Sequence, residues 1–295
     1  MDIDQARTFL AITAHGSFLK AARQLHVTQS TVSARIQRLE DELGTRLFVR
    51  NRAGASLTPA GRRFLDYAKR LVLTADQARV DAGLPARYHS RLRVGGRIAL
   101  WAGFLPQWVG WLRGCASDVV IRSEIGFEDE LMRRLVEGTI DIGLMYTPSH
   151  SPGLLVEHLF DETLVLVSTE PDTRMPGDDY VYIEWGSNFY AQHAQSFPDL
   201  EGPPQIANVG WLGVQLILQN GGSCFLPERM ARPFIASGQL HLVADSPDYL
   251  HPAYIVYPRQ SDNPVIGKAL EGMRELAMQQ ENNLVAVTDN DSEAL

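Results

Sequence analysis

The chain has 295 residues, a net charge of −8, 45% hydrophobic residues and 21% charged residues, as expected of a globular protein with more than one domain. It contains no run of about 18 apolar residues, so we expect no segment that spans a bilayer. The N-terminus lacks the basic and then apolar layout of a signal peptide, so we expect a cytoplasmic protein.

Charge is divided unevenly along the chain. Residues 1–90 hold 14 Lys and Arg against 8 Asp and Glu, a net charge of +6, which leaves −14 for the remainder. A basic first third on an acidic protein is typical of a nucleic-acid-binding module attached to another domain.

Three helices are predicted at the start of the chain. Residues 4–14 form the first, which ends near Gly16, and Ser17 is a suitable N-cap for a short second helix. Thr28 is a suitable cap for the third, which ends at Gly44. Two short helices joined by a tight turn form a helix-turn-helix.

The third predicted helix has two distinct faces. Its apolar residues follow a 4-3-4 spacing and make one stripe that faces a core: Val32, Ile36, Leu39 and Leu43. The other side and the first turn carry mostly small or polar residues: Gln29, Ser30, Thr31, Ser33, Ala34, Gln37 and Arg38. Glutamine can pair with adenine and hydroxyls can bond to bases or phosphates, so this face suits the major groove of DNA.

A β-hairpin wing is predicted after the third helix. Residues 47–50 and 56–58 are strand-like, and a turn-rich segment from Asn51 to Gly54 separates them. Arginines surround the predicted recognition helix and wing, where they suit phosphates or a narrow minor groove. They are Arg35, Arg38, Arg46, Arg50 and Arg52.

A long helix is predicted from Pro59 to about Ala82, with Thr58 as its cap. Its apolar residues follow a 4-3-4-3-4 spacing, typical of a coiled-coil seam, at Phe64, Ala68, Leu71, Ala75, Ala78 and Ala82. We therefore expect a second copy of the chain to pack on this helix. The alternative is an ordinary helix that packs on its own domain.

The long helix is expected to end at Gly83-Leu84-Pro85, and a hinge is expected at residues 87–91. The pattern of apolar and polar residues changes after this point. From Leu92 onward strand-like and helix-like runs alternate, which predicts an α/β domain with a mainly parallel sheet. The last predicted helix runs from Pro264 to Gln280. Residues 281–295 are acidic and unpatterned, so we expect a disordered tail.

The stretch from Phe9 to Leu65 resembles the winged helix-turn-helix of the LysR-type transcriptional regulators. The motifs that carry the resemblance are GSFxxAA, LxVTQSTVSxxIxxLExxLGxxLFxR and LTxAG. It implies an α/β fold class with an all-α-plus-wing N-terminal domain, a long linker helix and a two-subdomain, periplasmic-binding-protein-like effector domain. The domains would be 1–58, 59–90 and 91–280, with the first subdomain at about 91–160 and 265–280 and the second at about 161–264.

The resemblance also implies DNA-contacting residues. In that family the residues that match Gln29, Ser30 and Ser33 contact bases or nearby phosphates, and arginines matching Arg50 and Arg52 enter a minor groove. One position departs from the pattern, because Ala34 stands where some members have arginine, so a base contact there is lost or moves to Arg35.

The resemblance implies that a small-molecule effector, rather than a cofactor, binds between the two subdomains. Ligands in such folds lie at the carboxyl ends of strands and at helix N-termini, which selects Ala99, Leu100, Trp101, Glu128, Trp185, Gly186 and Asn208. Many members have Ser or Thr at the positions of Ala99 and Glu128. A carboxylate at this helix N-terminus disfavours an ordinary acidic effector, unless Glu128 only stabilises the helix dipole.

The expected partners are promoter DNA and a second copy of the chain as a homodimer, with a homotetramer implied by the family and RNA polymerase as a further candidate. An enzyme is disfavoured, because the sequence has no GxGxxG after a strand, GxxxxGK[ST], HExxH or GxSxG, and its histidines form no metal-ligand spacing. The basic N-terminal module disfavours the hypothesis that the chain is a solute-binding protein. We expect Cys115 and Cys224 to be two reduced thiols that are packed in the protein. The remaining alternative is a redox-gated regulator that uses these two cysteines.

Overall fold

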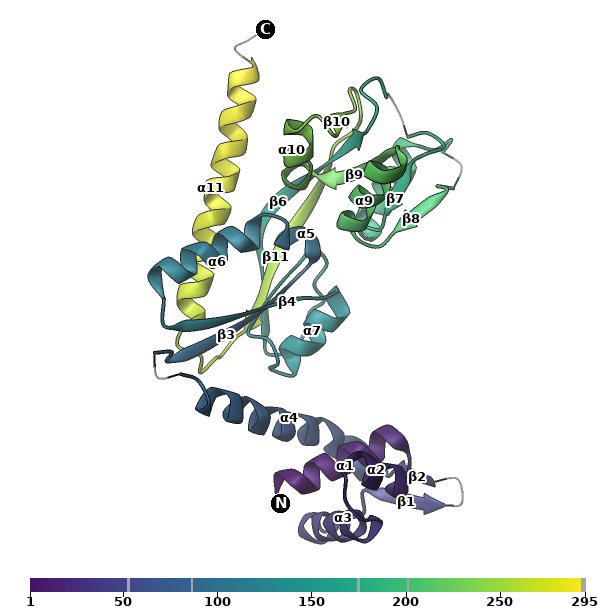
Figure 1. Ribbon diagram of the computed structural model, residues 1–295, viewed down its shortest axis with the longest axis vertical. Coiled ribbons are helices and arrows are strands. Elements are labelled where there is room, and N and C mark those ends of the chain that lie inside the picture. The colour runs from purple at the N-terminus through teal and green to yellow at the C-terminus, as the bar shows by residue number, and fades with distance from the viewer. Residues whose placement is uncertain (52–53, 86, 174–175, 201, 293–295) are drawn as a thin grey trace. The chain divides into compact units, whose positions relative to one another are not determined.

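The computed structural model describes residues 1–51, 54–85, 87–173, 176–200 and 202–292, and of residues 50, 51, 81 and 281–292 it describes the backbone alone. The chain divides into two compact units, Met1–Ala86 and Arg87–Leu295 (Figure 1). Each unit has its own apolar core. None of the described helices is both long and apolar enough to cross a membrane.

The first unit is four helices and a hairpin, as the sequence predicted. Its elements are α1 (Ile3–His15), α2 (Phe18–Gln24), α3 (Gln29–Leu43), β1 (Phe48–Asn51), β2 (Gly54–Leu57) and α4 (Pro59–Ala82). The strands pair antiparallel from Phe48 opposite Leu57.

The predicted helix caps of the first unit are present. The side chains of Ser17 and Thr28 accept hydrogen bonds from the backbone N–H of Lys20 and Thr31. Gly16 and Gly44 end α1 and α3 in the left-handed conformation, at φ of 60° and 65°, which glycine adopts without steric cost.

The first part of the long helix α4 packs against the other helices of the first unit. The rings of Phe64 and Phe9 lie 5.1 Å apart between centroids, edge to face, and Ala68 is completely buried in the core of the first unit. The first two residues of the predicted dimer seam therefore pack within the unit, because α1 lies against this part of α4. Beyond them Ala75 is half-buried and Ala78 is exposed.

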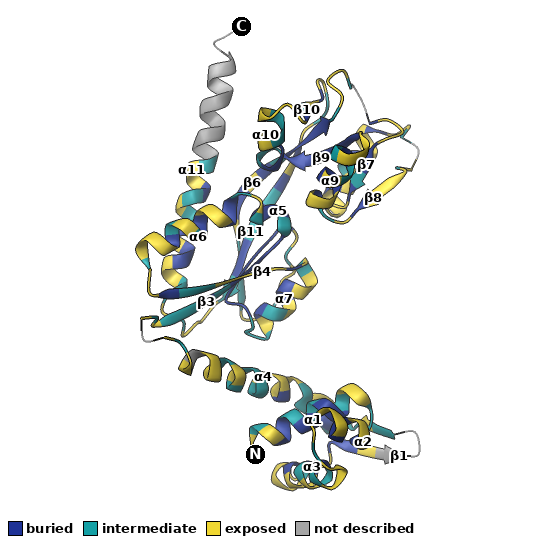
Figure 2. Cartoon of the chain, in the orientation of Figure 1, coloured by how far each residue is buried: buried dark blue, intermediate teal, exposed yellow. Residues whose placement is uncertain are grey.

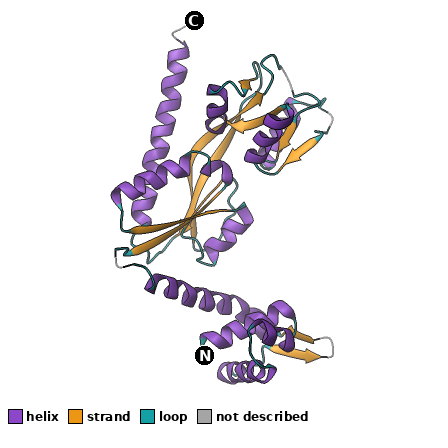
Figure 3. Cartoon of the chain, viewed as in Figure 1, coloured by secondary structure: helices purple, strands orange, loops and turns teal. Residues whose placement is uncertain are grey.

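The second unit alternates strands and helices over two lobes (Figures 1 and 3). Its strands are β3 (Ser90–Gly96), β4 (Val119–Ile125), β5 (Ile142–Met145), β6 (Leu154–Ser168), β7 (Val181–Ile183), β8 (Gln205–Ala207), β9 (Ser223–Pro227), β10 (His241–Leu242) and β11 (Tyr249–Pro258). Its helices are α5 (Ile98–Trp101), α6 (Phe104–Cys115), α7 (Glu128–Val136), α8 (Ser187–Ser196), α9 (Gly210–Asn220), α10 (Glu228–Ala236) and α11 (Ile266–Ser292). The first lobe contains β3, β4 and α5 to α7, and the second lobe contains β7 to β9, α9 and α10 (Figure 1).

The large sheet of the second unit has the order β10-β6-β11-β5-β3-β4, with β9 also paired to β6. The prediction of a mainly parallel sheet is wrong, because among the described pairs of this sheet β3–β4 and β3–β5 are parallel and the others antiparallel. The cause is the long antiparallel pair β6–β11, whose strands run from one lobe into the other (Figure 1).

Three short helices and the end of the last one differ from the sequence prediction. Helices α5, α8 and α10 were not predicted, since each is short and α10 has a proline within it, Pro233. Helix α11 continues to Ser292, although the sequence predicted an unpatterned tail from residue 281. No Gly or Pro interrupts residues 281–292, so nothing in that segment breaks the helix.

Candidate functional site

The exposed face of α3 is the first candidate site (Figure 2). Gln29, Ser30, Ala34, Gln37 and Arg38 are exposed, and Thr31 and Ser33 are half-buried at its edges. The opposite stripe at Val32, Ile36 and Leu39 is at most 1% exposed and forms the core. The helix therefore presents its small and polar residues outward, as the spacing predicted.

Three hydroxyl groups are linked by hydrogen bonds at the start of α3. The Oγ1 of Thr28 lies 2.7 Å from Ser30 Oγ and 2.8 Å from Thr31 Oγ1, and it also accepts the backbone N–H of Thr31 at 3.1 Å. These bonds restrict the rotamers of the exposed hydroxyls before anything binds. Such restriction lowers the entropy lost when a hydroxyl bonds to a partner.

The arginines around α3 do not share one environment. Arg35 donates from Nη2 to Asp4 Oδ2 at 2.7 Å and from Nη1 to Thr8 Oγ1 at 3.4 Å, so its guanidinium is tied to α1. Arg38 is exposed. The side chain of Arg50 and the whole of Arg52 lie outside the described residues, so their predicted contacts with DNA stay predictions.

The wing is attached to α3 by one carboxylate. Glu40 Oε1 accepts the backbone N–H of Leu47 at 2.7 Å and that of Phe48 at 3.2 Å. Because both N–H groups lie where the chain enters β1, the carboxylate fixes the start of the hairpin relative to the recognition helix. Nothing in the sequence indicated this contact, except that Glu40 lies 7 positions before Leu47.

An apolar groove of about 670 Å³ lies along α4 and the end of α3, and Met1, Leu43, Tyr67 and Leu71 are among its lining residues. Leu43 is 40% exposed, so the prediction that the core stripe of α3 extends to Leu43 is wrong. The helix ends at this residue, and its side chain lies in the groove rather than in the core.

The predicted effector residues have several different environments. Ala99 and Leu100 are buried in the core, and Asn208 is exposed. Trp101 donates from Nε1 to the carbonyl oxygen of Glu124, and Trp185, which precedes Gly186, donates to that of Phe225, each at 2.9 Å.

A polar cluster lies where β3 and β4 end. Arg97 follows β3, and its Nε is 3.2 Å from Glu128 Oε1 in the first turn of α7. The guanidinium carbon of Arg97 also lies 4.6 Å from the centre of the Phe127 ring. Glu128 therefore has an arginine partner. The sequence did not indicate this pair, because the two residues belong to different segments that are distant along the chain.

Two buried polar atoms near this cluster have no hydrogen bond among the described residues. They are Arg97 Nε, whose contact with Glu128 is an ion pair without a hydrogen bond, and His251 Nε2. Burial, and then the charge of Arg97, lower the pKa of His251 to about 4, so its imidazole is neutral near pH 7. Buried polar atoms without partners are rare in proteins and call for an explanation such as a bound molecule.

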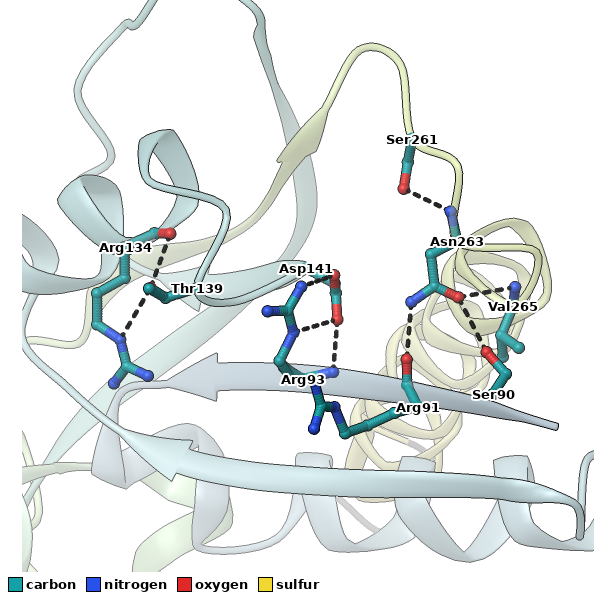
Figure 4. A network of polar contacts seen from close by, with 9 residues as sticks. All are labelled: Ser90, Arg91, Arg93, Arg134, Thr139, Asp141, Ser261, Asn263 and Val265. Atoms are coloured by element: carbon teal, nitrogen blue, oxygen red, sulfur yellow. Dashed lines mark hydrogen bonds and ion pairs between the residues drawn. The ribbon is translucent and has the colours of Figure 1, made fainter. Parts of the chain in front are cut away.

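A separate polar network joins β3 to the segment before α11 (Figure 4). The backbone N–H and the guanidinium of Arg93 both donate to the Asp141 carboxylate, at 2.6 to 3.0 Å. Asn263 donates to the carbonyl oxygen of Arg91 at 2.9 Å. These hydrogen bonds hold β3 to the segment before β5 and to the segment before α11.

The two cysteines differ in exposure. Cys115 is exposed, so the prediction that both thiols are packed is wrong for this residue, whereas Cys224 is buried. Burial raises the pKa of the Cys224 thiol, which disfavours the reactive thiolate. The redox-gated alternative is therefore disfavoured. Within the described part of the chain, no group of three His, Cys, Asp or Glu side chains is placed to hold a metal ion.

Comparisons with known proteins agree with this architecture. Residues 3–62 match the family described as "Bacterial regulatory helix-turn-helix protein, lysR family", and residues 86–277 match "LysR substrate binding domain". The HTH-type transcriptional regulator HdfR of Yersinia enterocolitica is 30% identical over 282 residues, which cover 92% of this chain and 95% of HdfR. HdfR of Yersinia pestis is 29% identical over the same length.

Solved structures share the fold. CbnR, a LysR family transcriptional regulator, has a TM-score of 0.64 and 20% identity, with 94% of this chain and 99% of CbnR covered. A structure of full-length CbnR with its target DNA has a TM-score of 0.63, 20% identity, and coverage of 94% and 100%. The family matches cover both units, so the chain belongs to the LysR family of bacterial DNA-binding transcriptional regulators.

Proposed function

We propose that the protein recognises promoter DNA through α3, with Gln29, Ser30, Thr31 and Ser33 at base edges or nearby phosphates. The observation that carries this proposal is the exposed polar face of α3 with its linked hydroxyls. Arginines supply the electrostatic attraction to phosphates, and Arg38 is better placed for this role than Arg35, which is tied to Asp4.

The proposal includes self-association through α4. The apolar groove beside Tyr67 and Leu71 is the surface that a second copy would cover, and a homodimer matches the two half-sites of a typical operator. A homotetramer built from two dimers and a contact with RNA polymerase extend this proposal. The site of action would be the bacterial cytoplasm, and no catalytic activity is proposed.

We also propose that a small-molecule effector, not a cofactor, binds beside Arg97 and His251. The support is the pair of buried polar atoms without hydrogen bonds and the neighbouring aromatic rings of Phe127 and Trp185. Glu128 pairs with Arg97, so its carboxylate is no longer a reason against an anionic group on the effector. The effector would carry a polar group that bonds to these two side chains.

The DNA proposal is tested by mapping genome-wide binding of the wild type and of a Gln29→Ala, Ser33→Ala variant at one fixed salt concentration, since salt alone shifts such affinities by orders of magnitude. We expect the variant to lose the promoters that the wild type occupies. The matched control is Gln195→Ala with Ser196→Ala, an exposed Gln and Ser on α8. Equal occupancy by the two double variants would contradict the proposed role of α3.

The effector proposal is tested with Arg97→Met in cells that carry a reporter gene behind an occupied promoter. We expect the variant to occupy the promoter and to hold the reporter at one level across growth conditions that change it in the wild type. A reporter response equal to that of the wild type would exclude Arg97 from effector binding and leave the DNA proposal intact.

A further inference from the structure

Arg229 joins the two lobes of the second unit. It belongs to α10 in the second lobe, and its guanidinium donates to two carbonyl oxygens of the first lobe at the end of α5. Nη1 donates to Ala102 at 2.9 Å and Nη2 donates to Ala99 at 3.2 Å. Helix α9 also contacts α5, and the hydrogen bonds of Arg229 add polar contacts of defined geometry.

The guanidinium is held in place by Glu162 on the crossing strand β6. Arg229 Nε donates to Glu162 Oε1 at 2.9 Å, and Nη2 bonds to the same oxygen. The Glu162 side chain is 4% exposed and that of Arg229 is 17% exposed. A planar guanidinium can bond to one carboxylate and two carbonyl groups together, whereas a lysine ammonium is a single point charge.

The chain leaves room for this side chain at Gly103. A Cβ atom at this position would lie 2.7 Å from Arg229 Nη1, and the backbone has φ of +145°. Glycine therefore satisfies both the conformation and the close approach of the guanidinium. The loop between α5 and α6 fits around Arg229.

The same carboxylate also reaches the proposed effector site. Glu162 Oε2 accepts the hydroxyl of Tyr146 at 2.5 Å, and the Tyr146 ring lies 4.0 Å from the His251 ring between centroids. A continuous set of contacts thus runs from the α5 carbonyl groups through Arg229, Glu162 and Tyr146 to His251.

We propose that Arg229 is a positioning residue, which sets the spacing of the two lobes by fastening α5 to α10 through Glu162. The proposal rests on the proposed effector function, since the spacing matters for a ligand between the lobes. Loss of the fastening would populate a more open arrangement of the lobes. DNA recognition by α3 does not require Arg229, so the two functions can be tested separately.

The test measures the distance between the lobes in the full-length protein by electron paramagnetic resonance. One nitroxide is attached to the exposed Cys115 on α6 and the second to an Asp199→Cys substitution in the loop after α8, while the buried Cys224 stays unlabelled. Labelled protein is diluted with unlabelled protein, so that distances within one chain dominate. The variants are Arg229→Lys and, as the matched control on the same helix, the exposed Arg232→Lys.

We expect Arg229→Lys to raise the fraction of chains with the longer distance about tenfold, because losing a hydrogen bond to a charged group shifts an equilibrium by about that factor or more. Arg232→Lys should give the same distance distribution as the wild type. Glu162→Gln, which weakens the hold on Arg229, is expected to shift the distribution in the same direction and replaces Arg229→Lys if that variant fails to fold. Distributions that superimpose on the wild type, or an equal change in Arg232→Lys, would overturn the proposal. Operator binding by the same samples reports on the DNA function independently.

Discussion

The rings of His251 and Tyr146 lie against each other with 4.0 Å between their centroids and an angle of 33° between their planes. The phenol has a partner in Glu162, but His251 Nε2 has none among the described residues. The imidazole is 4% exposed, so adding a proton there places an unpaired charge in a buried site beside Arg97.

This burial predicts a pH dependence of stability. The pKa of His251 falls from 6.5 to about 4 on folding, so between these values the unfolded chain binds more protons than the folded chain. The free energy of unfolding therefore falls as pH falls from 6.5 towards 4, by about 3 kcal/mol from this residue. Denaturant unfolding of wild type and His251→Phe from pH 7 to pH 4 should show a shallower fall in the variant. A control substitution at the exposed His150 should leave the slope unchanged.

Arg38 and Arg35 should differ in their effects on DNA binding. Arg38→Ala removes an exposed cation and is expected to weaken binding to all sequences and to lower the salt dependence of log K by about 1. Arg35→Met should leave the salt dependence nearly unchanged and cost less than about 1 kcal/mol of stability, because it removes a surface pair with Asp4. Binding titrations over a salt series check both, and equal slopes for the two variants would contradict the assignment.

Glu40→Ala should destabilise the first unit by about 2 kcal/mol, because the backbone N–H groups of Leu47 and Phe48 both lose their acceptor. Glu40→Gln keeps an acceptor oxygen and should recover most of that loss. Urea unfolding of the full chain, followed by a signal from the first unit, provides the measurement. If Glu40→Gln were as unstable as Glu40→Ala, the hydrogen bonds would not be the cause.

Self-association should depend on the groove beside α4. Leu71→Glu with Tyr67→Glu places two charges in a surface whose apolar residues would be covered by a second copy, and we expect the dimer to dissociate at least about tenfold more readily. Sedimentation over a range of concentrations gives the dissociation constant. Glu substitutions at Asp66 and Lys69 on the exposed face of α4 are the control, and an unchanged constant in the groove variant would place the interface elsewhere.

The two thiols should react at different rates. Cys115 is exposed and Cys224 is buried with a raised pKa, so a thiol reagent should modify one cysteine per native chain and both after denaturation. Mass spectrometry of the modified protein locates the labels. Rapid loss of both thiols from the native protein, with a disulfide between them after mild peroxide, would restore the redox-gated alternative.

The first unit could be predicted almost completely from the sequence because its signals are local. Ser17, Thr28 and Gly44 each act within one turn of the helix that they begin or end. The spacing of Val32, Ile36 and Leu39 identifies the buried stripe without any knowledge of distant residues. The prediction that Leu43 is buried was wrong because the spacing of apolar residues does not show where the core ends.

The second unit was less predictable because its decisive contacts are distant in sequence. Arg229 and Glu162 are 67 positions apart, and neither residue type at its position suggests the other. Strand β11 enters the sheet between β5 and β6 and runs antiparallel to both. Individual strands and helices could be read from local runs, but their direction and neighbours could not.

The position of β11 also has a consequence for synthesis on the ribosome. The first unit, Met1–Ala86, has its own core, so it can fold as soon as it emerges. The first lobe of the second unit must wait for the strand Tyr249–Pro258 and for α11, where Ala269 accepts the indole N–H of Trp108 at 2.9 Å. A nascent or truncated chain that stops before Tyr249 would therefore hold a finished DNA-reading unit beside an unfinished sensor, and it would compete for the operator without responding to the effector.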